Sequence, residues 1–297
     1  MLQETPPIHI GCPMWTHTKW QNVFFAAGTS TKDHLENYSN FYTSVEGNTT
    51  FYALPKLETV QNWADSTADN FKFCFKLPQK ITHELQLINC QSEVDSFLNL
   101  LGPIIATGKL ATIQIQLPPY FSANQLVSLS KFLELNSRKV NFSVEVRHLD
   151  FFNKQQEEKD LNQLLIQYQV DRIMMDTRPV HSQVPSTEAI KDAQLKKPKV
   201  PVHVLSTANQ PIVRYVGQTN IEANRAFIQP WLKHFKLWLE QGKKPYLFIH
   251  TADNAYLHDL TRLWLSMLEQ SLGYYPAHNT LFPVEKAKLE ANQASLF

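Results

Sequence analysis

The 297-residue chain lacks most features that would identify a nucleotide-cofactor or membrane protein. Its 8 glycines form neither a phosphate-binding loop nor a dinucleotide fingerprint. No apolar run approaches the roughly 18 residues that a membrane span needs. The first residues, MLQETPPIHIG, lack the basic and apolar regions of a signal peptide. We therefore expect no membrane partner and a cytoplasmic location.

The chain also has few cysteines and a net charge close to zero. Cys12, Cys74 and Cys90 are odd in number and lack metal-ligand spacing, which favours reduced thiols over disulfides. The net charge of +1, with histidine neutral, provides no overall field that would attract nucleic acid. An anion-binding function would therefore need a local cluster of cations. The 43% of hydrophobic residues suffices for a large core, in one barrel-sized domain or two smaller ones.

Short β-rich runs recur along the whole chain, at 8–11, 44–48, 72–77, 112–117, 142–147, 172–177, 211–217 and 246–251. Helical patterns lie between them, most clearly at 91–101, 123–135, 155–168, 222–240 and 254–270. In the last of these, one predicted buried face consists of Tyr256, Leu260, Leu263, Trp264 and Met267. Regular alternation of strand and helix over this length is typical of a (β/α)8 barrel.

We therefore predict an α/β protein with a single (β/α)8 TIM-type barrel over residues 1–275 and a short flexible tail over 276–297. The alternative is a doubly wound open sheet, whose first strand usually leads into a glycine-rich turn. Here the first predicted strand leads into CPMWTHTKW, which favours the barrel.

Charged residues end most of the predicted strands. Active sites of these barrels lie at the C-terminal ends of the strands. The carboxylates there are Glu46, Glu145 and Asp176, and the cations are Lys76, Arg147, Arg178 and Arg214. Four cations against three carboxylates favour an anionic ligand, such as a phosphate or carboxylate, held by arginine. The alternative is a ring of internal ion pairs that only neutralise one another.

Residue chemistry suggests roles within this set. The candidate catalytic residues are Glu46, Glu145, His83 and Asp176. The candidate ligand-binding residues are Trp15, Asn48, Tyr52, Lys76, Gln116, Arg147, His148, Arg178, Arg214, His250 and Asn254. Cys12 could act as a nucleophile if a histidine activated it, although a buried inert cysteine is the commoner case.

A divalent metal is a further alternative that the pattern does not favour. Its ligands would be Glu46, Glu145, Asp176 and His250. Because arginine and lysine are interleaved with these residues, an ion-pair lattice fits the pattern better than a metal site. We expect no metal, and the cofactor stays unassigned.

The longest segment predicted to be irregular, residues 178–207, follows the sixth strand. A long loop in this position of a barrel is a usual place for a binding site. It carries a short basic run formed by Lys196, Lys197 and Lys199. A solvated loop is the favoured interpretation, and a phosphate-contacting patch is the alternative.

Several motifs together resemble those of the domain-of-unknown-function 72 family, the YecE-like proteins. They are VEGNTTFYALP (45–55), FKFCFKLPQKITHE (71–84), QLPPYF (116–121), VEVRH (144–148), DTRPVH (176–181), VRYVG (213–217) and FIHTADN (248–254), with IGCPMW near the start. The resemblance covers residues 8–272 and implies a TIM barrel without implying a reaction. Related barrels act on sugars or damaged DNA with metals, but their histidine ligand pattern is not matched here.

The last five residues resemble a different motif, the pentapeptide by which bacterial DNA polymerases and repair proteins bind the replication sliding clamp. Its candidate partner-binding residues are Gln293, Ser295, Leu296 and Phe297. Glutamine would supply amide hydrogen bonds, while leucine and phenylalanine would enter an apolar pocket as anchors. The alternatives are that the end folds back on the barrel or has no role.

Two functions follow from these observations. In the first, the protein is a DNA-maintenance accessory factor that is tethered to the clamp and binds a nucleotide or DNA ligand in the barrel mouth. In the second, it is an enzyme or binding protein for a sugar or sugar phosphate, and the tail is incidental. Hydrolase or lyase chemistry is compatible with the residues in both cases. A third alternative is a non-catalytic adaptor.

Overall fold

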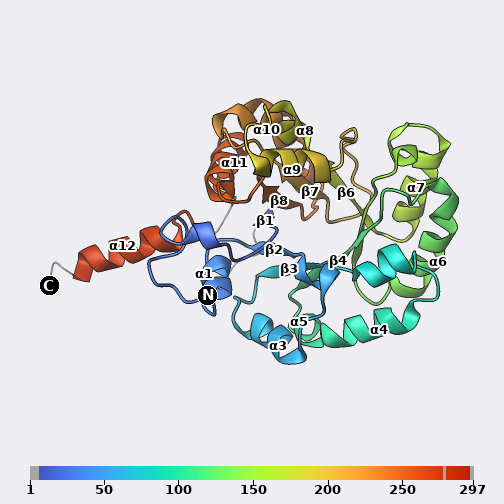
Figure 1. Cartoon of the computed structure of the whole chain (residues 1–297), viewed down its shortest axis with the longest axis horizontal. Coiled ribbons are helices and arrows are strands. Elements are labelled where there is room, and N and C mark those ends of the chain that lie inside the picture. Colours follow the sequence, from blue (N-terminus) through green and yellow to red (C-terminus); the bar gives the residue numbers. More distant parts are fainter. Residues whose placement is uncertain (1–6, 277–278, 295–297) are drawn as a thin grey trace.

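The computed structural model describes residues 7–276 and 279–294 (Figure 1). Eight strands alternate with helices along this part of the chain, as predicted. The strands are β1 (His9–Gly11), β2 (Ser44–Gly47), β3 (Lys72–Lys76), β4 (Leu110–Gln116), β5 (Phe142–Glu145), β6 (Asp171–Asp176), β7 (Ile212–Val216) and β8 (Tyr246–His250).

The helices surround the strands and connect them in sequence. The α-helices are α1 (His34–Ser39), α2 (Thr49–Tyr52), α3 (Leu57–Asp65), α4 (Gln91–Leu100), α5 (Gly102–Ala106), α6 (Leu126–Asn136), α7 (Gln156–Gln167), α8 (Arg178–Ser182), α9 (Glu188–Lys196), α10 (Arg225–Glu240), α11 (Leu257–Leu272) and α12 (Pro283–Ala294). Shorter helical turns are η1 (Thr18–Trp20), η2 (Lys80–Glu84), η3 (Ala123–Gln125), η4 (Leu149–Phe152) and η5 (Glu222–Asn224).

All paired strands are parallel, in the order β1-β8-β7-β6-β5-β4-β3-β2. The first and last strands in this order meet through the backbone. The amide of Thr43 donates to the carbonyl of Ile10 at 3.1 Å, and that of Glu46 donates to the carbonyl of Cys12 at 2.9 Å. These bonds bring the edges together into a TIM-type barrel and exclude the open doubly wound sheet.

Close approach of β1 and β2 explains one of the few glycines. A Cβ atom built on Gly11 would lie 2.2 Å from the carbonyl oxygen of Ser44. No real Cβ atom tolerates this distance from a backbone oxygen, so any larger residue would push the two strands apart. Gly11 therefore lets the barrel close at the seam between β1 and β2.

Residues alternate between the barrel interior and the helical layer, because successive side chains of a strand point to opposite faces. Near the C-terminal ends of the strands, the interior positions carry polar groups, while the neighbouring apolar residues pack under the helices. For example, Glu46 on β2 contacts Arg214 on β7 across the interior, whereas Val45 belongs to the main apolar core. The fold thus buries apolar residues between the strands and the surrounding helices, and it gathers charged residues inside the mouth of the barrel.

Helix α11 shows how the predicted helical pattern becomes packing. Leu260, Leu263, Trp264 and Met267 are buried, as their spacing predicts. Tyr256 does not join them: it precedes the helix and is 53% exposed. The helix ends at Leu272, and the following Gly273 caps it with a φ of 80°, the left-handed conformation that favours glycine.

The prediction of an irregular segment over 178–207 is wrong for almost half of its length, because two helices lie within it. Helix α8 starts directly after β6, and α9 follows it. The hydroxyl of Thr187 caps α9 by accepting a hydrogen bond from the amide of Ile190 at 3.2 Å. Ile190 and Ala193 provide a buried face that is too short to stand out in the sequence.

The segment predicted as a flexible tail contains helix α12, which Figure 1 shows extending away from the barrel. Its start is anchored, because Phe282 is buried against Phe24 and Phe41 with ring centroids 5.4 and 4.9 Å apart. The guanidinium of Arg262 lies 3.7 Å from the centroid of Phe282. Polar residues of 283–292 therefore form a helix that starts on the barrel surface.

Among the described residues, none of the helices combines the length and apolar character that crossing a membrane requires.

Candidate functional site

A polar cavity of about 510 Å³ opens at the mouth of the barrel. Its floor and walls come from the ends of β3, β4, β6, β7 and β8 and from the chain that follows β1, β2, β3, β5 and β8, and α9 covers one side. Residues predicted from the sequence that line it are Asn48, Tyr52, Lys76, His83, Gln116, Arg147, Arg214, His250 and Asn254. The volume is in the range of small-molecule sites.

Arg214 is the centre of the charge network at the base of this cavity. It is 3% exposed, and its Nε forms an ion pair with Oε1 of Glu46 at 2.8 Å. Its Nη1 atom also donates to Oε2 of Glu145. Both glutamates are almost completely buried. One guanidinium from β7 therefore bridges carboxylates from β2 and β5, on other sides of the barrel.

Three further groups complete the network. Arg147 donates from Nε to Oε1 of Glu145 at 2.8 Å. Nζ of Lys76 donates to Oε1 of Gln116 at 2.7 Å and lies 3.7 Å from Oε1 of Glu46. Nε2 of His250 lies 3.1 Å from Oε2 of Glu46.

The two buried carboxylates stay ionised. Burial alone would raise the pKa of Glu46, but Arg214, Lys76 and His250 outweigh it and hold the pKa well below 4.5. At Glu145, burial again raises the pKa, but Arg214, Arg147 and Lys76 lower it by more, to about 2. A group with so low a pKa is a poor proton donor or acceptor at neutral pH. Both residues therefore fit a positioning role better than the predicted acid–base role.

The histidines of the cavity are neutral at neutral pH. Burial lowers the pKa of His250 to about 3, against the opposing effect of Glu46. Burial and the nearby Arg147 also lower the pKa of His83, whose Nδ1 lies 2.8 Å from the hydroxyl of Thr82. His83 lines the cavity, so its neutral ring is available to accept a proton from a ligand.

Lys197 is a cavity residue that the sequence did not assign to the site. It follows α9 directly and lines the cavity. Burial and the positive charge of Arg214 lower its pKa to about 8, and the same two causes lower that of Lys76 to about 8. The basic run that contains Lys197 could be seen in the sequence, but only the packing of α9 places this lysine over the mouth.

The mouth carries more positive than negative charge. Lys76, Arg147, Lys197 and Arg214 face only two carboxylates, Glu46 and Glu145. The remaining charged pair at the rim, Lys196 and Asp192, neutralises itself at 2.7 Å. Two positive charges are therefore unbalanced around a cavity that is large enough for a ligand.

Six predicted site residues lie outside the cavity lining: Glu46 and Glu145, which belong to the charge network described above, and Asp176, Arg178, Trp15 and His148. Asp176 and Arg178 pair with each other at 2.7 Å, and the indole of Trp231 on α10 donates to Oδ2 of Asp176 at 2.8 Å. Trp15 packs edge-on against Trp63. His148 accepts from the amide of Asp150 and caps η4. On β6 it is Met175, the neighbour of Asp176, that reaches the cavity.

Within residues 7–276 and 279–294, no three or more His, Cys, Asp or Glu side chains form a group that could hold a metal ion. The physical reason is the pairing just described. Glu46 and Glu145 are bound to arginine, and Asp176 faces away from them. Cys12 is equally unsuited to nucleophilic attack, because it is completely buried and burial raises the pKa of its thiol to about 12.

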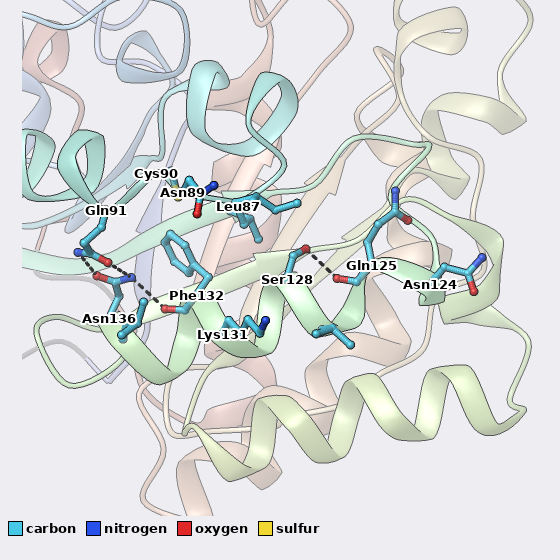
Figure 2. Close-up of a pocket in the computed structure, with 13 residues that line it drawn as sticks. Leu87, Asn89, Cys90, Gln91, Asn124, Gln125, Ser128, Lys131, Phe132 and Asn136 are labelled. Carbon is cyan, nitrogen blue, oxygen red and sulfur yellow. Dashed lines mark hydrogen bonds between the residues drawn. The ribbon is translucent and has the colours of Figure 1, made fainter.

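A second cavity of about 510 Å³ lies far from these charges, between residues 87–91 and α6 (Figure 2). Leu87, Phe132 and other apolar groups line it, and Lys131 is its single charged lining residue. Gln91 and Asn136 close one end by hydrogen bonds to each other at 3.0 and 3.2 Å. Because Cys90 and Lys131 are its only titratable lining residues, whereas the barrel mouth gathers several, the mouth is the better candidate for a functional site.

The fold and the cavity define the class of protein: a TIM-type barrel with a cationic pocket at the C-terminal ends of its strands. The chain belongs to the family described as "Protein of unknown function DUF72", whose profile matches residues 9–280. This confirms the resemblance that the sequence motifs carry.

Relatives match nearly the whole chain. UPF0759 protein YecE of Escherichia coli K12 is 42% identical over 91% of this chain and 97% of its own length. UPF0759 protein YunF of Bacillus subtilis 168 is 21% identical, with 93% and 100% covered.

Solved structures share the fold. A DUF72 family protein from Enterococcus faecalis V583 is 18% identical and matches with a TM-score of 0.65, over 90% of this chain and 97% of that one. Another from Thermotoga maritima MSB8 is 16% identical with a TM-score of 0.66, over 88% and 99%.

Proposed function

We propose that the barrel mouth binds a compact phosphate-bearing ligand, either a sugar phosphate or a single nucleotide. The observation that carries this proposal is the pair of unbalanced positive charges around the cavity. Arginine forks match the planar array of phosphate or carboxylate oxygens. A cavity of about 510 Å³ admits one such molecule and no duplex.

Each polar group has a place in this proposal. Glu46 and Glu145 hold Arg214 and Arg147 in fixed positions, so that little rotamer freedom is lost when a ligand binds. Arg147 is the more accessible of the two arginines, with a side chain 19% exposed, and would contact the anion first. Gln116 holds the amine of Lys76. The exposed ring of Tyr52 at the rim offers a flat face for the rest of the ligand.

Isothermal titration calorimetry with inorganic phosphate, a nucleoside monophosphate and a sugar phosphate tests the proposal. Removing one charged donor costs about 1.5 to 3 kcal/mol, which corresponds to roughly 10- to 150-fold in affinity. We expect this loss in Arg147→Gln. The matched control is Arg225→Gln, which removes an exposed arginine paired with Glu222 on the helical layer. Equal affinity in both variants, or no binding of any anion, would refute the site.

We propose in addition that the C-terminal residues bind a bacterial replication sliding clamp, which would give the protein a role in DNA maintenance. Support comes from the motif and from Gln293, an exposed residue near the end of α12. Ser295, Leu296 and Phe297 lie outside the described residues. Because α12 extends from the barrel, a partner at its end would leave the mouth open (Figure 1).

A titration of the whole protein against purified clamp tests this second proposal. We expect micromolar binding that Leu296→Ala with Phe297→Ala removes, because these side chains are the apolar anchors. The thermal midpoint should stay unchanged, and phosphate binding should too. Binding that persists in the double variant would overturn the assignment of these anchors, and absence of binding in the parent would leave only the small-molecule function.

A further inference from the structure

The amine of Lys197 stands out among the lysines of the cavity. Nζ of Lys76 is bound to Gln116 and lies beside Glu46, and Lys196 pairs with Asp192. Within the described part of the chain, Nζ of Lys197 makes neither a hydrogen bond nor an ion pair closer than 4 Å. One amine therefore faces the ligand space without a fixed partner.

The surroundings of this amine favour its neutral form. Burial and Arg214 lower its pKa to about 8, Glu46 and Glu145 oppose this shift, and Arg147 adds to it. At pH 7, about one molecule in ten then carries the free amine, against fewer than one in a thousand for an ordinary lysine. Lysines that are desolvated next to another cation are the ones that proteins use as amine nucleophiles.

We propose that Lys197 is a catalytic nucleophile that forms an imine with the aldehyde or ketone group of a phosphate-bearing carbonyl compound held in the barrel mouth. The inference rests on the proposed anion site, because Arg147 and Arg214 would bind the phosphate while the carbonyl carbon faces Nζ. Lys76 is less suited, since its amine is already committed to Gln116.

The chemistry needs no group beyond the protein and the ligand. The lone pair of Nζ attacks the carbonyl carbon, and the C=O pair moves to the oxygen, which takes up a proton. Loss of that oxygen as water, with one further proton taken up and one released from nitrogen, leaves a protonated C=N bond. The balance is one amine, one carbonyl and one proton giving one iminium and one water. An iminium accepts electrons from a neighbouring C–H or C–C bond, which is lyase or isomerase chemistry.

The structure offers a group for proton movement in this step. His83 lines the same cavity and is neutral at neutral pH, because burial and Arg147 lower its pKa. It can accept a proton released at nitrogen or carbon. Glu145, with a pKa of about 2, stays negative and offsets the positive charge of the iminium.

Pyridoxal 5′-phosphate, a phosphate-bearing aldehyde, is the probe for the test. The full-length protein is incubated with it at pH 7.5, reduced with borohydride and mapped by peptide mass spectrometry. We expect labelling of Lys197 at least tenfold above that of the exposed Lys191. Pyridoxal without the phosphate should label Lys197 much less. Lys197→Arg keeps the charge and should lose the label while retaining phosphate affinity within about threefold, which shows that the variant is folded.

The outcomes separate this inference from the anion site itself. Phosphate binding with labelling spread over surface lysines, or centred on Lys76, would overturn the assignment of Lys197 and leave the anion site standing. Labelling of Lys197 that inorganic phosphate does not suppress would support the reactive amine and overturn the anion site. Suppression by phosphate, with label lost in Lys197→Arg and kept in Lys76→Arg, supports both.

Discussion

The barrel buries two networks of charged residues that differ in what they face. The mouth network joins Arg214 to Glu46 and Glu145 beside a cavity. The second joins Arg172 on β6 to Glu158 on α7 at 2.9 Å, between the barrel wall and the helical layer. There the guanidinium also donates to Asn162 at 2.8 Å and to the carbonyl of Phe151 at 2.6 Å.

The second network is saturated by the protein itself. Glu158 accepts from Arg172, from the amide of Lys154 at 2.9 Å, and lies 2.7 Å from Nδ1 of His203. One cation meets one carboxylate, and Arg172 lines neither of the two cavities described above. In the mouth, by contrast, cations exceed carboxylates and border open space. Buried charge by itself therefore does not mark a site, whereas unbalanced charge beside a cavity does.

The largest expected effect is on the saturated network. Arg172→Met leaves Glu158 buried without its main cationic partner, so we expect the free energy of unfolding to fall by about 3 to 5 kcal/mol. Urea unfolding followed by circular dichroism measures it. Lys191→Met, which breaks an exposed pair with Glu188, is the matched control and should cost less than about 1 kcal/mol. Phosphate affinity should be unchanged in both, and a loss of affinity in Arg172→Met would remove the distinction between the networks.

Glu145→Gln should affect both stability and binding, in opposite directions. The charge-assisted bonds from Arg147 and Arg214 weaken, which we expect to cost about 2 kcal/mol of unfolding free energy. The mouth gains one further unbalanced positive charge, so phosphate should bind severalfold more tightly. Calorimetry on the folded variant decides this. Weaker binding would mean that Glu145 matters more for orienting Arg147 than for its charge.

Acid should destabilise the mouth through His250. Its pKa is about 3 in the folded protein and near 6.5 when unfolded, so the unfolded state takes up the proton first as pH falls. Stability is then lost from about pH 6.5 downward, by up to about 1.4 kcal/mol per pH unit from this residue. Glu46 and Glu145, whose pKa values are lowered, add a loss beginning near pH 4.5.

Comparing the parent with His250→Gln isolates this contribution. The slope of unfolding free energy against pH reports the number of protons taken up on unfolding. Between pH 6 and 5, we expect this number to be smaller by nearly one in the variant. An unchanged slope would show that His250 is not held neutral.

Alkaline pH should have the smallest effect, on ligand affinity. Lys76 and Lys197 have pKa values of about 8, so raising the pH through 8 removes positive charge from the mouth. We expect phosphate affinity to fall by a few-fold to tenfold between pH 7 and 9, with proton uptake on binding at pH 8. Calorimetry in two buffers of different ionisation enthalpy measures that uptake, and no uptake would contradict the lysine assignment.

The sequence by itself determined the barrel and most of the strand-end residues at its mouth. Strand and helix periodicities are local, and each strand delivers its last residues to the same end of a parallel barrel. Glu46, Lys76, Glu145, Arg214 and His250 could therefore be predicted to meet. The residues at the predicted strand ends also indicated that cations would exceed carboxylates.

Only the tertiary structure decided which groups face the cavity. Asp176 turned toward Trp231 while its neighbour Met175 entered the mouth, because the facing of each residue depends on how its strand is staggered against the others. Lys197 reached the site because α9 packs over it, and Phe282 anchored α12 through contacts with residues more than 200 positions away. Such long-range packing has no local signal in the chain, whereas periodicity does.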